Sequence, residues 1–158
     1  MYQHRNCELE EARLLQKSHL VRLKDTTAEI AKGKVVVRDL DLAHVDELEV
    51  LMQEGILEHL LNFRCFVTTK GEDTKDEAVV NNIIKEIESG KRMLYFLSGI
   101  HRYMAIKRVQ PNFIALVHIY DSELLSWSAA QYIATRDNKV KNRTKKTIIL
   151  SCLYQFYQ

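Results

Sequence analysis

The stretch that decides the fold is Arg92-Met-Leu-Tyr-Phe-Leu-Ser-Gly-Ile-His-Arg-Tyr-Met-Ala-Ile-Lys-Arg108. An apolar run leads through Ser98 and Gly99 into a helical segment, so we expect a buried strand that continues directly into an α-helix. The first amides of a helix have no carbonyl partner within it, and they lie at the positive end of the helix dipole. The junction is therefore suited to hold an anion such as phosphate.

The side chains at this junction also have the chemistry of a phosphate site. Gly99 lets the backbone approach a ligand closely, and Ser98 is the expected N-cap. His101 and Arg102 fall in the first helical turn, where both can donate to phosphate oxygens. The structural alternative is that Arg102 pairs with a surface carboxylate, His101 packs inside and Gly99 only makes a turn. Short junctions of this kind are common, so the residues alone leave both interpretations open.

Three segments together resemble a known superfamily. Tyr95-Phe-Leu-Ser-Gly-Ile-His-Arg-Tyr103, followed by a helix and the strand Phe113–Ile119, resembles the signature of the ParB and sulfiredoxin-like superfamily. Asp41-Leu-Ala-His-Val-Asp-Glu-Leu48 is similar to the helix that opens the nucleotide pocket of sulfiredoxins. Ala134–Lys139 resembles the acidic-Asn motif of ParB-like domains. The resemblance covers roughly residues 34–139, and its Gly-Ile-His-Arg element is the most specific part.

The resemblance implies a compact α/β fold, with a mixed sheet, flanking helices, an added N-terminal helix and a helical C-terminal tail. It also implies that the Gly-Ile-His-Arg element holds the phosphates of a nucleotide. The residues that it assigns to this site are Ser98, Gly99, Ile100, His101, Arg102, His44 and Asn138.

Departures from the family pattern limit the chemistry that the resemblance implies. Sulfiredoxins carry a catalytic Cys where this chain has Ile100, and sulfinic acid repair needs that thiolate. ParB-type CTPases place a metal-binding Glu at the same position, so Ile100 also removes a carboxylate ligand for magnesium. A further departure is Glu47, whose charge would repel a triphosphate. We therefore expect a nucleotide-binding domain, for ATP or another nucleotide with or without Mg, and not an active sulfiredoxin.

Composition bounds the fold and the location of the chain. The 158 residues, of which 46% are hydrophobic and 28% charged, are typical of one globular domain. No 18-residue apolar run and no secretory signal are present, so we expect an intracellular protein, cytoplasmic or nuclear, that has no membrane contact. The three cysteines are odd in number and widely spaced, which favours free thiols. The six histidines share no ligand spacing, so no metal site is expected.

The pattern along the chain predicts three parts: an N-terminal helical extension (1–33), a core (34–122) and a C-terminal helical segment (123–158). Predicted helices cover 7–32, 44–54, 76–89, 100–110 and 124–136, and predicted strands cover 35–37, 63–69, 92–97 and 113–119.

A basic run and an apolar segment follow the predicted core. The run from Arg136 to Lys146 carries six basic residues against one acid. It can attract DNA, although a solvated surface is the simpler interpretation, and it lacks the aromatic residues that stack on bases. Thr147–Tyr157 is apolar nearly all round and must be buried or pair with a protein partner or a second copy. The basic residues are Arg136, Lys139, Lys141, Arg143, Lys145 and Lys146.

Two functions of other classes compete with nucleotide binding. One is a DNA-associated or protein-interaction module that uses the basic run. The other is a nucleotide-dependent phosphotransferase or nuclease in which Asp46 or Glu47 acts as a base.

Overall fold

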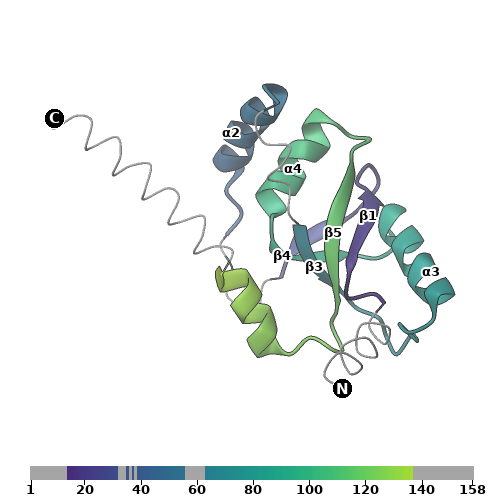
Figure 1. Ribbon diagram of the computed structural model, residues 1–158. Coiled ribbons are helices and arrows are strands. Elements are labelled where there is room, and N and C mark those ends of the chain that lie inside the picture. Colours follow the sequence, from purple (N-terminus) through teal and green to yellow (C-terminus); the bar gives the residue numbers. More distant parts are fainter. Residues whose placement is uncertain (1–13, 32–34, 36, 38, 56–62, 137–158) are drawn as a thin grey trace, which may run out of the picture.

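A five-stranded mixed sheet forms the centre of the protein in the computed structural model, which describes residues 14–31, 35, 37, 39–55 and 63–136 (Figure 1). The element order is β1 (Ser18–Arg22), β2 (Ala28–Ile30), α2 (Leu42–Gln53), β3 (Phe63–Val67), α3 (Glu77–Glu88), β4 (Leu94–Ser98), α4 (Ile100–Val109) and β5 (Ile114–Asp121). Residues 127–136 form a further helix. The α/β class and the mixed sheet with flanking helices are therefore confirmed.

The strands lie in the order β1-β5-β3-β4-β2. β1 runs antiparallel to β5, and β3 antiparallel to β4. The other two pairs, β5 with β3 and β4 with β2, are parallel. The strand that leads into the predicted phosphate junction, β4, thus lies inside the sheet with a neighbour on each side, which holds its end firmly in place.

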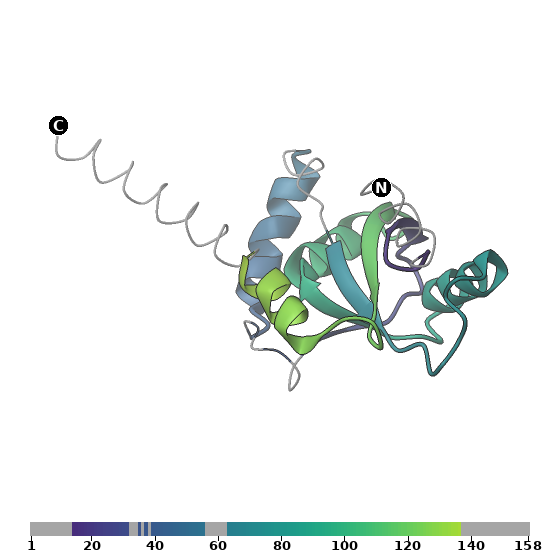
Figure 2. The ribbon, with the colours of Figure 1, turned by 60° about the horizontal axis from the view of Figure 1, so that its bottom comes forward.

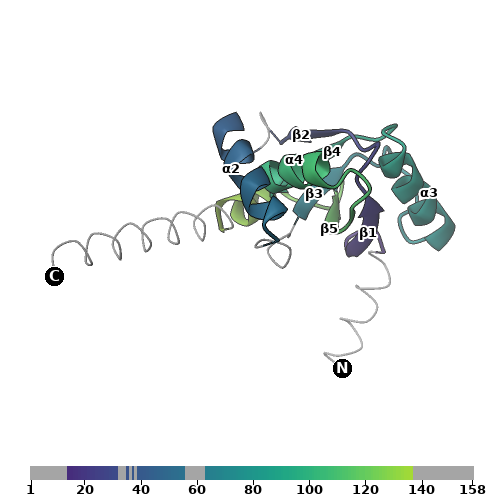
Figure 3. The same ribbon diagram turned by 90° about the horizontal axis from the view of Figure 1, so that it is seen from above.

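Helices pack on both faces of the sheet (Figures 2 and 3). The main core lies on one face, where α2, α3 and α4 contribute residues such as Val45, Ile83 and Ile106. A second apolar cluster lies on the other face, where Ala130 of the helix at 127–136 packs near Phe66 and Leu97. Alternate residues of each inner strand therefore enter different cores.

The predicted helix over residues 7–32 is wrong where the structure describes it. Ser18–Arg22 and Ala28–Ile30 are strands, and they pair with β5 and β4. This segment lies within the sheet and is not peripheral to the core. The helix formers that suggested the prediction lie before residue 18, while pairing with distant strands decides the conformation of the rest.

The predicted strand over residues 35–37 is also wrong, because neither Val35 nor Val37 lies in a strand. Val35 is buried in the second cluster. The strand that pairs with β4 at this edge of the sheet is β2, which lies earlier in the sequence.

The remaining predicted elements match the structure to within a few residues. Local signals explain this agreement, since both α2 and α3 begin at an aspartate that caps the helix. The Asp41 carboxylate accepts from the His44 amide at 3.3 Å, and the Asp76 carboxylate accepts from the Ala78 amide at 3.0 Å.

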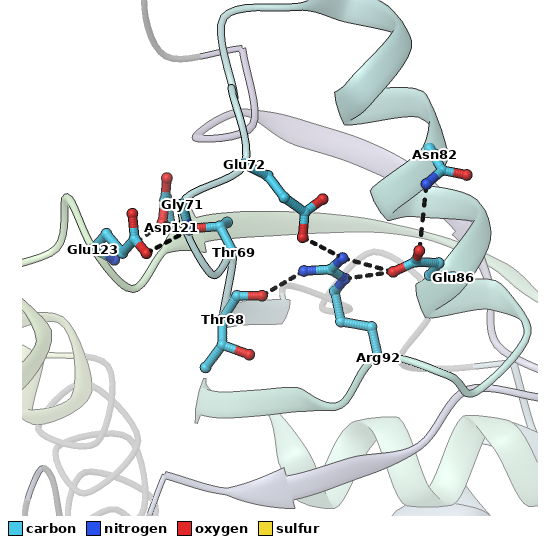
Figure 4. A network of polar contacts seen from close by, with 9 residues as sticks. All are labelled: Thr68, Thr69, Gly71, Glu72, Asn82, Glu86, Arg92, Asp121 and Glu123. Atoms are coloured by element: carbon cyan, nitrogen blue, oxygen red, sulfur yellow. Dashed lines mark hydrogen bonds and ion pairs between the residues drawn. The ribbon is translucent and has the colours of Figure 1, made fainter.

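Arg92 fixes the loop before α3 to the end of that helix (Figure 4). Its guanidinium donates to Glu72 at 2.7 Å, to Glu86 at 2.6 Å and to the Thr68 carbonyl. Only 12% of the Arg92 side chain is exposed, so these charge-assisted contacts are partly shielded from water. They tie β3, the loop and α3 into one unit.

The outer edge of β1 faces α3. The Arg22 amide donates to the Glu88 carboxylate at 2.9 Å, although the two residues lie 66 positions apart. A side chain thus occupies one of the backbone donors that this edge strand directs away from the sheet.

Candidate functional site

The predicted junction is present between β4 and α4. Gly99 is the N-cap of α4 and has φ 95°, in the left-handed region that glycine adopts without strain. Ser98, predicted as the N-cap, is instead the last residue of β4 and is buried. The strand pairing of Ser98 with Arg64 keeps it in the sheet, so the turn falls one residue later.

His101 joins the first turn of α4 to the start of α2. The Asp41 amide donates to His101 Nε2 at 3.0 Å. A nitrogen that accepts a hydrogen bond carries no proton, so this geometry assigns the ring proton to Nδ1. His101 is buried and lies on the α2 side of the helix.

The structure brings His44 next to His101, as the resemblance implies. The two rings meet edge to face with centroids 5.4 Å apart. His44 Nδ1 lies 3.6 Å from a Glu47 carboxylate oxygen. The region between α2 and the first turn of α4 therefore contains two imidazoles and a carboxylate, so an anion placed there would meet a negative charge as well.

A cavity of about 360 Å³ lies along another face of α4. Ile100, in the first turn, is the one predicted site residue among those that line it. The lining residues are Thr26, Ala28, Ile100, Tyr103, Met104, Lys107 and Arg108. The cavity thus has apolar walls, hydroxyl groups and two cations.

Lys107 is held in place by a chain of hydrogen bonds at the wall of the cavity. Its ammonium donates to the Thr26 carbonyl at 2.7 Å and to the Tyr103 hydroxyl at 3.3 Å. The Tyr103 hydroxyl lies 2.6 Å from Thr26 Oγ1, which donates to the Leu23 carbonyl at 2.7 Å. Since an ammonium has three protons, these contacts leave Lys107 one proton for a ligand.

Arg108, the second cation, is shared with α2. Its guanidinium lies 3.3 Å from the Asp46 carboxylate and 3.7 Å from the Glu49 carboxylate. Asp46, considered from the sequence as a base, is thus part of an ion pair that joins the two helices.

Arg102 does not line the cavity. It follows Ile100 by two positions, which places it roughly 200° further around the helix axis. The junction residues therefore separate: Ile100 lines the cavity, His101 faces α2, and Arg102 starts from a position on the helix roughly opposite Ile100.

Several predicted residues fall outside the described part of the chain. These are Asn138, Lys139, Lys141, Arg143, Lys145 and Lys146, together with the apolar segment Thr147–Tyr157. Arg136 is described and is exposed in the helix at 127–136.

Other titratable groups add no site to this picture. Burial raises the pKa of the Cys65 thiol, so it remains protonated and is a poor nucleophile. Burial, with Arg64 and His19 nearby, lowers the pKa of His118 on the other face of the sheet.

The described residues contain no group of three or more His, Cys, Asp or Glu that could bind a metal. None of their helices has the length and apolar character needed to cross a bilayer.

Reasoning from sequence missed Lys107, Tyr103 and Thr26. Helical spacing from Ile100 could have indicated the first two, because positions three and seven residues further lie on the same face. Thr26 had no such signal, since it lies 77 positions before Tyr103 and was predicted to be helical.

No family model matches the sequence, and a search of curated proteins finds no significant match. The ParB and sulfiredoxin-like resemblance therefore stays a prediction.

Proposed function

We propose that this chain binds a small phosphate-bearing ligand, with a nucleotide as the leading class, in the cavity beside α4. The observation that carries the proposal is the lining of the cavity, where Lys107 and Arg108 adjoin the apolar side chains of Ile100 and Met104. A phosphate ester has the same two parts, an anion and an organic group. At about 360 Å³ the cavity falls within the size range of small-molecule sites.

Lys107 is the residue to which we assign the phosphate. It is half-buried, so its charge is less screened than that of a surface lysine. Its contacts with Thr26 and Tyr103 orient the ammonium before a ligand arrives, which lowers the entropy cost of binding.

The start of α4 lies at the other end of the same cavity. Ile100, in the first helical turn, lines the cavity seven residues before Lys107, which lies in the last turn. At 1.5 Å per residue the two positions are roughly 10 Å apart along the helix axis, so a phosphate held by Lys107 lies away from the first-turn amides, and the role of Gly99 stays a prediction.

Calorimetry and thermal shift with AMP, ATP and inorganic phosphate test the proposal. We expect saturable binding that Lys107→Met weakens roughly tenfold or more, because a charge-assisted contact contributes about 1.5–3 kcal/mol. Lys85→Met, an exposed lysine of α3, removes the same charge elsewhere and should leave affinity unchanged.

Because Lys107 also supports Thr26 and Tyr103, its loss could disturb folding. Met104→Trp fills the cavity without removing a charge, and it should also abolish binding. Failure of every phosphate compound to bind, or equal affinity in all these variants, would refute the proposal.

DNA binding through the basic run is the alternative, and it rests on residues that lie almost wholly outside the described part of the chain. A duplex belongs in the same thermal-shift series. Stabilisation by duplex DNA alone would favour this alternative over a small ligand.

A further inference from the structure

We infer that the cavity selects ligands with a single phosphate group over diphosphates and triphosphates. This inference rests on the proposed function and concerns the charges around the same cavity.

The two cations of the cavity differ in their surroundings. Lys107 contacts a carbonyl and a hydroxyl, and no carboxylate pairs with it among the described residues. Arg108 lies near two carboxylates, those of Asp46 and Glu49. Lys107 is therefore ready to accept an anion, whereas Arg108 is already matched by acids of α2.

A first phosphate can pair with Lys107 at little electrostatic cost. A second or third phosphate that extends toward Arg108 comes close to Asp46 and Glu49, which lie within 3.3 and 3.7 Å of the guanidinium. Both carboxylates repel an added phosphate, and Glu49, of which 25% is exposed, is less screened by water than Asp46, of which 70% is exposed. A longer phosphate chain would thus contact one cation, Arg108, and also approach two carboxylates, those of Asp46 and Glu49.

The α2 side of the first helical turn offers no better path. His44 lies near the Glu47 carboxylate, and the Asp41 carboxylate caps α2 beside His101. An anion that extends in this direction also approaches carboxylates.

The cavity is open to solvent, so its volume of about 360 Å³ does not by itself limit the length of a ligand. The selection therefore rests on the charges, and a nucleoside monophosphate or a sugar phosphate is the ligand class that we assign.

Competition among phosphate compounds tests the inference. Isothermal titration at low salt, with EDTA present, compares AMP, ribose 5-phosphate, ADP and ATP. We expect AMP or ribose 5-phosphate to bind at least about tenfold more tightly than ATP. Tighter binding of the sugar phosphate than of AMP assigns a sugar phosphate, and the reverse order assigns a nucleoside monophosphate. ATP binding as tightly as either would overturn the inference while leaving the proposed function standing, whereas no binding by any compound would remove both.

Charge-neutralising variants identify the cause of the selection. Asp46→Asn with Glu49→Gln should shift the preference toward ATP by roughly tenfold, because Arg108 becomes available. Asp73→Asn with Glu77→Gln changes the net charge equally at exposed positions outside the cavity and should leave the ratio unchanged. If the ratio of AMP to ATP affinity stays unchanged in Asp46→Asn with Glu49→Gln, or shifts equally in both double variants, the carboxylates of α2 are not the cause of the selection.

Discussion

Replacing Gly90 by alanine should destabilise the fold far more than the same change at Gly71. Gly90 ends α3: its amide donates to the Ile87 carbonyl at 3.1 Å, and the next amide donates to the Glu86 carbonyl at 2.9 Å. Its φ is +81°, and a Cβ there would lie 2.5 Å from the Asp25 carbonyl oxygen. Gly71 has a similar φ of +78°, but no atom lies within 4 Å of its added Cβ.

The two contributions can be estimated separately. A left-handed backbone costs a residue with a side chain about 1–2 kcal/mol, and this applies at both positions. Forcing the backbone away from Cβ adds about 1–3 kcal/mol at Gly90 alone. We therefore expect Gly90→Ala to lose about 2–5 kcal/mol of unfolding free energy, and Gly71→Ala about 1–2 kcal/mol.

Urea denaturation of the wild type and both variants, followed by circular dichroism, measures these losses. At this chain length each kcal/mol lowers Tm by roughly 2–4 °C, so thermal melts give an independent check. Equal losses at the two glycines would refute the reasoning, because the close approach of Asp25 would then contribute nothing.

Three other changes test the network, the electrostatics and the site. Arg92→Met should cost about 2–4 kcal/mol in urea denaturation, since the Thr68 carbonyl and two carboxylates lose their donor, whereas Lys91→Met on the surface should cost little. The lowered pKa of His118 means that the unfolded chain binds more protons below about pH 6.5, the ordinary value for histidine. Stability should therefore fall as pH falls through that value, and His118→Gln should reduce this loss when denaturation is measured at pH 7.5 and 5.5. Arg102→Ala separates two positions for phosphate: a tenfold loss of affinity places the phosphate beside Arg102, and unchanged affinity agrees with the cavity lysine.

Local signals predicted the part of the fold that positions the site. The apolar run, Gly99 and the helix after it gave β4 and α4, and the aspartate caps gave the starts of α2 and α3. Such signals depend on neighbouring residues, so the sequence displays them directly.

The features that were missed depend on long-range contacts. β1 and β2 have five and three residues, and their partners lie far along the chain. The same applies to the cavity, where Thr26 meets Tyr103 across 77 positions. The residues of the first turn of α4 predicted an anion-binding site. The direction of each side chain depends on how α4 packs on α2 and β2, which the local sequence does not display.

The contact between Glu88 and the Arg22 amide bears on how this protein avoids aggregation. An edge strand is a template on which another chain can add a strand, and such addition needs its outward backbone donors. At β1 a carboxylate already occupies one of them, so an incoming strand would have to displace a charge. The opposite edge strand, β2, has only three residues and offers a short template. Removing the charge by Glu88→Ala would leave a solvated N–H on a five-residue edge, where intermolecular strand pairing can begin.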